Sequence, residues 1–142
     1  MDNPMSSSRP TLVNPPGLYD PAPNGYSHIA VVPAGTRLAF IAGQGGETAD
    51  GQLSNDFREQ VRQAMANLLI AIEAAGGQSS QVAKLTVLIV DHSEQRLGIL
   101  GEELTRAFGE QVKPACTLIP VPRLALDGML FEIDAVVALP GE

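Results

Sequence analysis

The stretch MLFEIDAVVAL, residues 129–139, decides the fold of this chain. It has the length and composition of a β-strand, and successive side chains of a strand point to opposite faces of a sheet. One face would carry Met129, Phe131, Ile133 and Val137, and the other Leu130, Glu132, Asp134, Val136 and Ala138. Both faces are largely apolar. Because a large uncovered apolar face is rare on a soluble monomer, we expect helices on one side of the sheet and a partner subunit on the other.

The rest of the chain supplies the other strands and two helices. Apolar, β-branched stretches predict strands at 27–32, 37–42, 84–90 and 115–121. The turn-forming Pro33-Ala34-Gly35 between the first two predicts a hairpin. Apolar residues recur at helical spacing over 56–75 and 93–109, with Ser93 as the N-cap of the second helix. The order β-β-α-β-α-β-β indicates an α/β (α+β) fold, a mixed sheet with two helices on one face.

Length and composition indicate one domain. A chain of 142 residues has enough material for a single core. Its first part is rich in Pro, Ser and Asn and has no apolar block that could serve as the core of a signal peptide. We therefore expect a flexible arm over residues 1–20 and a single domain over residues 21–140.

Charge and cysteine content limit the classes of binding partner and cofactor that we expect for this chain. A net charge of −7, scattered basic residues and the absence of Trp disfavour nucleic-acid binding. No apolar run is long enough for a membrane span. Cys116 is the only cysteine, so no intrachain disulfide can form and a cytoplasmic location is the simplest expectation. Two histidines and one cysteine far apart do not make a metal-ligand pattern, and we expect no metal and no cofactor.

Four segments resemble one known family in their order and spacing. They are Pro21–His28, Ile41–Gln44, Asn67 with Glu73–Gly76, and the block that begins with Pro114-Ala115-Cys116-Thr117 and runs through Glu132–Ala135. Over about residues 20 to 139 the chain resembles the Rid (YjgF-type) family, to which the older label endoribonuclease L-PSP is attached. The resemblance implies a chorismate-mutase-like fold, a homotrimer, and clefts between subunits for a small-molecule metabolite.

The resemblance also implies roles for particular residues. In deaminating members an arginine directly after Pro-Ala holds the carboxylate of a 2-imino acid, and a glutamate of the last strand places the attacking water. A guanidinium matches a carboxylate bidentately, and a carboxylate can accept a proton from water. Carried over by position, Glu132 is the expected catalytic residue, and the expected substrate-binding residues are Tyr26, Gly43, Gln44, Cys116 and Thr117.

Two positions depart from the family pattern. Cys116 stands where the arginine would be, and Ala42 replaces the serine usual before the Gly-Gln pair. A cysteine there could be a nucleophile if its pKa were lowered, although a small packing residue is the commoner role of cysteine. Without a cation, a carboxylate ligand would face Glu132 uncompensated, which is unfavourable. The substrate is therefore expected not to be a simple 2-imino acid.

Two function classes stay open at this point. The first is a hydrolase of C=N bonds, an enamine or imine deaminase. The second is a trimer that binds a metabolite or a partner without chemistry. The endoribonuclease reading is disfavoured by the net charge of −7.

Three further residues have open roles in this reading. Asp134 shares the face of Glu132 and is either functional or a rim residue. His28 shares strand parity with Tyr26, but a packed or solvated strand histidine is the simpler interpretation. Arg123 is the one cation that could replace the missing arginine, although exposure to solvent is the default for arginine.

The run Gly43–Gly46 is not a phosphate loop, because a turn rather than a helix is expected after it.

Overall fold

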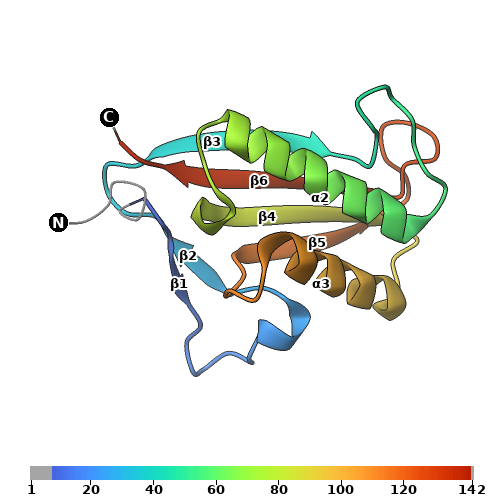
Figure 1. Ribbon diagram of the computed structural model, residues 1–142. Helices are drawn as coiled ribbons and strands as arrows, with labels where there is room; N and C mark the ends of the chain where they lie inside the picture. The colour runs from blue at the N-terminus through green and yellow to red at the C-terminus, as the bar shows by residue number, and fades with distance from the viewer. Residues whose placement is uncertain (1–7, 142) are drawn as a thin grey trace.

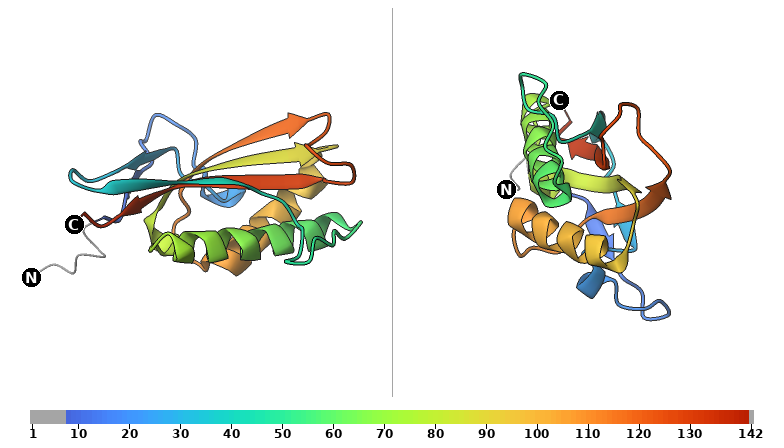
Figure 2. Two further views of the ribbon diagram at one scale, coloured as in Figure 1. Left: turned by 90° about the horizontal axis from the view of Figure 1, so that it is seen from above. Right: turned by 90° about the vertical axis from the view of Figure 1, so that its right-hand side faces the viewer.

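The structure, a computed structural model of the chain, describes residues 8–141. Its main sheet has four strands in the order β3-β6-β4-β5, and two helices lie together against one face of it (Figures 1 and 2). A separate two-stranded sheet pairs β1 with β2. The elements are β1 (Thr11–Val13), the 3-10 helix η1 (Ala22–Asn24), β2 (Ile29–Val31), β3 (Arg37–Gln44), α2 (Phe57–Ala74), the 3-10 helix η2 (Ser79–Gln81), β4 (Val82–Val90), α3 (Glu94–Phe108), β5 (Ala115–Val121) and β6 (Phe131–Leu139).

Local sequence signals set the ends of both helices. The side chain of Asp56 accepts a hydrogen bond from the Glu59 amide and caps α2, and Ser93 caps α3 in the same way through the amide of Arg96. Gly109 ends α3 with φ of 81°, a conformation that favours glycine. The predicted helices over 56–75 and 93–109 are thus confirmed.

The last strand occupies the centre of the main sheet. It pairs antiparallel with β3 on one side and with β4 on the other, and β4 pairs parallel with β5 across the connection made by α3. Phe131, Ile133 and Val137 are fully buried on the face beneath the helices. The opposite face, here called the open face, leaves Phe40 at 75% and Leu38 at 48% exposure. The predicted mixed sheet with two helices on one face is confirmed.

The predicted hairpin between 27–32 and 37–42 is wrong. β2 pairs with β1, and β3 pairs with β6. Gly35, with φ of 82°, redirects the chain between them, and β6 supplies β3 with a long antiparallel partner that the three-residue β2 cannot match. The strand β1 comes from the segment expected to be a flexible arm, whose residues 1–7 lie outside the described part. A domain boundary at residue 20 stays a prediction.

Candidate functional site

The carboxylate of Glu132 lies directly over the backbone of Gly43. A β-bulge in β3 creates this contact: Ile41 faces Ala135 and Gln44 faces Ile133, so two residues of β3 oppose one of β6. A Cβ atom on residue 43 would lie 2.6 Å from Cδ and 2.8 Å from Cγ of Glu132. The predicted site residues Gly43 and Glu132 are therefore neighbours, and glycine is the residue that leaves room for the glutamate.

Two amide side chains of α2 hold the loops on either side of this contact. Asn67 Nδ2 donates to the carbonyls of Gly45 at 3.0 Å and Glu47 at 2.8 Å. Gln60, fully buried, donates through Nε2 to the Gly128 carbonyl at 2.9 Å and accepts from the Leu130 amide at 2.9 Å. Both loops are thus tied to one helix, which positions Gly43 and Glu132 relative to each other.

The role of Gln60 was not predicted from the sequence. Its signal was a polar residue three positions after Phe57, on the apolar stripe of the helix. Buried polar groups need hydrogen-bond partners, so an amide in that place indicates a structural tie.

Tyr26 and Cys116 line one cavity of about 240 Å³ on the helix side of the sheet. Leucines of α3 form one wall, and the cavity reaches β5 and the segment around η1. The lining residues are Tyr19, Asn24, Gly25, Tyr26, Leu97, Leu100, Leu104, Cys116 and Leu118. None of them is a cation or an anion at neutral pH. We call this space the Cys116 cavity.

The Cys116 thiol is held in its neutral form. Burial raises its pKa to about 11, and the charge of Lys84 only partly opposes this shift. A thiol with so high a pKa has almost no thiolate at neutral pH, and thiolate is the nucleophilic form. The packing interpretation of Cys116 is therefore favoured over the nucleophile.

The hydroxyl groups of Tyr19 and Tyr26 hydrogen-bond to each other at the mouth of the cavity. This bond, with smaller contributions from burial and from the nearby Tyr19 and Cys116 charges, raises the pKa of Tyr26 to about 12. His28 completes an aromatic group: its ring meets both tyrosine rings edge-on, and its Nε2 lies 2.8 Å from the Tyr19 carbonyl oxygen. His28 is thus half-buried against the two tyrosines just before β2, and the raised pKa keeps Tyr26 uncharged at neutral pH.

Cys116 and Glu132 lie on opposite faces of the sheet. Cys116 pairs with Leu85, which is buried beneath the helices, whereas Glu132 pairs with Leu88, three residues further along β4. Residues an odd number apart in a strand point to opposite sides. Within one chain, the site residues therefore form two groups rather than one pocket.

Thr117, Gln44 and Arg123 lie outside both groups. Thr117 points to the open face, where its Oγ1 lies 2.7 Å from Lys84 Nζ. Gln44 donates to the Ala42 carbonyl at 3.0 Å. Arg123 forms an ion pair with Asp127 at 3.0 Å, is 66% exposed and does not line the Cys116 cavity.

The described residues contain neither a metal-ligand cluster nor a membrane-spanning helix. Between residues 8 and 141, no group of three His, Cys, Asp or Glu side chains is placed to hold a metal ion. No helix in that part of the chain is long and apolar enough to cross a bilayer.

The fold and the cavity at the edge of the sheet define a small α+β protein with a mixed four-stranded sheet and helices on one face. The profile of the family described as Endoribonuclease L-PSP matches residues 19–139. The chain belongs to this family, the YjgF/Rid family.

Individual relatives agree with this placement. The chain is 37% identical to a RutC family protein of Pyrococcus horikoshii, over 68% of this chain and 75% of that one. It is 32% identical to the RutC family protein YjgH of Escherichia coli, over 72% and 76%. Among solved structures, the conserved Rid-family protein YyfB of Yersinia pestis is similar with a TM-score of 0.87 at 30% identity, covering 92% of this chain and 99% of that one.

Proposed function

We propose that this chain assembles as a homotrimer whose intersubunit clefts hydrolyse an imine or enamine that carries no carboxylate. The observation that carries the proposal is the Glu132 carboxylate over Gly43. Within residues 8–141, no other group forms a hydrogen bond or an ion pair with this carboxylate. It is half-buried at a sheet face, where a water molecule is the natural partner for its oxygens.

A carboxylate bound to water suits the chemistry. The water oxygen forms a bond to the imine carbon while one of its protons passes to Glu132, and the C=N double bond becomes a single bond as the nitrogen takes up a proton from solvent. The resulting carbinolamine then forms C=O as its hydroxyl proton returns to solvent, and it breaks its C–N bond, which releases ammonia or an amine. The proton held by Glu132 leaves with the nitrogen, and the carboxylate is regenerated.

The Cys116 cavity supports a substrate without a carboxylate. A carboxylate ligand would need a counter-charge, and the lining offers a neutral thiol, tyrosine side chains and leucines but no lysine, arginine or histidine. The apolar lining favours an uncharged group of modest size instead, since pockets for drug-sized ligands have about 300–1,000 Å³.

The homotrimer is proposed because one chain does not combine the two halves of the site. Glu132 lies on the open face and Cys116 on the other. The open face carries exposed Leu38, Phe40 and Ile119, an apolar surface that a partner subunit would cover. Packing of neighbouring subunits around this face would bring the Glu132 of one chain toward the sheet edge of the next.

The test is hydrolysis of imines generated in solution from neutral amines and from amino acids. We expect the wild type to accelerate hydrolysis of the neutral imines and to act poorly on 2-imino acids. Glu132→Gln should reduce the rate by about 10²–10⁴-fold, the usual contribution of a general base. Glu73→Gln, the same chemical change at an exposed site on α2, is the matched control. Binding of a small molecule without any acceleration would instead identify a non-catalytic binding trimer.

A further inference from the structure

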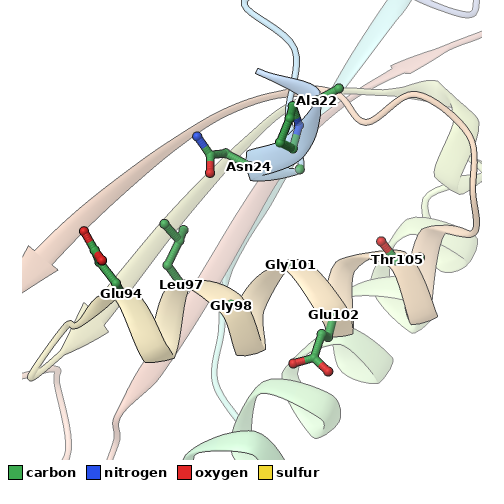
Figure 3. A pocket seen from close by; sticks show the side chains of 10 residues that line it. Ala22, Asn24, Glu94, Leu97, Gly98, Gly101, Glu102 and Thr105 are labelled. Atoms are coloured by element: carbon green, nitrogen blue, oxygen red, sulfur yellow. The ribbon is translucent and has the colours of Figure 1, made fainter. Parts of the chain in front are cut away.

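A groove of about 670 Å³ lies between α3 and η1 (Figure 3). Gly98 and Gly101 of α3 form its floor, and η1 forms one wall. Glu94 lies toward the start of α3 and Thr105 toward its end, as the figure shows. The groove is wider than the Cys116 cavity and opens to solvent.

The two glycines are not explained by packing within the chain. Both lie inside α3, where glycine is less favourable than alanine. A Cβ atom on either would meet no atom within 4 Å, and neither has a positive φ. These two glycines therefore leave space above α3 that no side chain of this chain fills.

The groove adjoins the Cys116 cavity. Asn24, Gly25 and Leu97 line both spaces. Gly25 ends η1 in the left-handed region, with φ of 81°, and its amide donates to the Ala22 carbonyl at 2.9 Å. This tight turn places η1 at the boundary between the two adjoining spaces.

We propose that cavity and groove form one elongated site, whose ligand carries an apolar group at one end and no negative charge. Glu94 and Glu102 border the groove, and Glu102 already pairs with Arg58 at 3.2 Å. No lysine, arginine or histidine lines either space. Because the only acidic or basic side chains that line the two spaces are Glu94 and Glu102, an anion is disfavoured there and an amine is favoured. This inference rests on the ligand cavity of the proposed function but requires no chemistry.

Binding of defined probes tests the inference separately from catalysis. We would titrate the full chain with benzylamine, 4-phenylbutylamine and 4-phenylbutyrate and follow binding by calorimetry. Each methylene removed from water contributes about fourfold to affinity, so the three extra methylenes of 4-phenylbutylamine should strengthen its binding over benzylamine by at least about tenfold. The carboxylate of equal length should bind more weakly than the amine.

Variants of the groove floor test whether the tighter binding of 4-phenylbutylamine arises from contacts in the groove. Gly101→Leu and Gly98→Leu place a side chain in open space, and each should remove the advantage of 4-phenylbutylamine while leaving benzylamine unchanged. Gly101→Ala, which adds a single methyl group, should have a smaller effect. Ala66→Leu adds the same leucine at an exposed position on α2 and should change neither probe.

The outcomes separate this inference from the proposed function. Loss of long-probe binding in the leucine variants supports the elongated site even if the protein hydrolyses no imine. Equal binding of both amines, tighter binding of 4-phenylbutyrate, or leucine variants that bind like the wild type would each overturn it. A change of oligomeric mass in Gly101→Leu would also overturn it, because the groove would then be a contact between copies of this chain.

Discussion

Glu132 and Gly43 are in direct contact across two neighbouring strands, with the glutamate side chain filling the space where a Cβ of residue 43 would lie. The contact depends on the bulge between Ile41 and Gln44, which turns the glycine backbone toward the carboxylate. A residue without a reactive group thus decides where the expected general base lies.

Gly43→Ala should therefore reduce imine hydrolysis without unfolding the protein. The new methyl group would force Glu132 from its rotamer, at a cost of about 0.5–1.5 kcal/mol in the free energy of unfolding. The rate of hydrolysis should fall toward that of Glu132→Gln. The double variant Gly43→Ala with Glu132→Gln should be little slower than Glu132→Gln alone, since both changes disable the same carboxylate. Gly17→Ala, at a position where a Cβ meets nothing within 4 Å, is the control. Additive losses in the double variant would argue against this coupling.

Cys116→Arg should make 2-imino acids better substrates. It would place a guanidinium where the family's deaminases carry one, and a charge-assisted hydrogen bond to a carboxylate contributes about 1.5–3 kcal/mol. The measurement is hydrolysis of 2-imino acids by the wild type, Cys116→Arg and Cys116→Arg with Glu132→Gln. Cys116→Ser, which adds no charge, should show no gain. Robust wild-type activity on 2-imino acids would refute the role given to Cys116, and full activity of the double variant would refute that of Glu132.

Phe40→Lys should disrupt the proposed trimer. Phe40 is 75% exposed on the open face, and a lysine there would put a charge into the subunit contact. Light scattering after size-exclusion chromatography should give about three times 14.9 kDa for the wild type and a smaller mass for the variant. Ile70→Lys, at a residue 66% exposed on α2, should leave the mass unchanged. A monomeric wild type at micromolar concentration would contradict the proposal.

Glu103 should give the protein an acid-dependent stability. This buried carboxylate of α3 bonds Arg62 and Arg58 of α2, at 2.9–3.1 Å, and the Arg62 bond contributes most to holding its pKa below the ordinary value. Its contribution to stability is then complete above the unfolded pKa of about 4.3 and is lost as pH falls through the lower folded pKa.

Glu103→Gln measures this contribution. At pH 7 this substitution should lower the free energy of unfolding by about 1–3 kcal/mol. A value in the lower part of this range is expected, because Arg58 and Arg62 are partly exposed and solvent screens their charges. Urea unfolding between pH 3 and 7 should show that the difference between wild type and variant shrinks toward the acid end. Glu102→Gln, on an exposed glutamate of the same helix, should have a much smaller effect. A difference that stays constant with pH would exclude this mechanism.

Much of the fold follows from local patterns in the sequence. The apolar stripes and the caps Asp56 and Ser93 determine the two helices, because caps and periodicity act within a few residues. Alternation along 129–139 correctly separated the buried from the half-buried face of β6 as far as Val137, whereas Ala138, assigned to the face of Glu132, is fully buried. Glu132 and Gly43 were both expected at the site from their place in the family pattern, and the structure places them in contact.

Only the tertiary structure decided how those pieces combine. Alternation tells which residues of one strand share a face, but the register between strands decides whether Cys116 and Glu132 share one, and they do not. The partner of β2 was equally hidden, because a strand pairs through backbone groups that any residue supplies. The amide ties of Gln60 and the glycine floor of α3 likewise arise from contacts between segments far apart in the chain. Such contacts depend on where the whole core places each backbone, which no local pattern encodes.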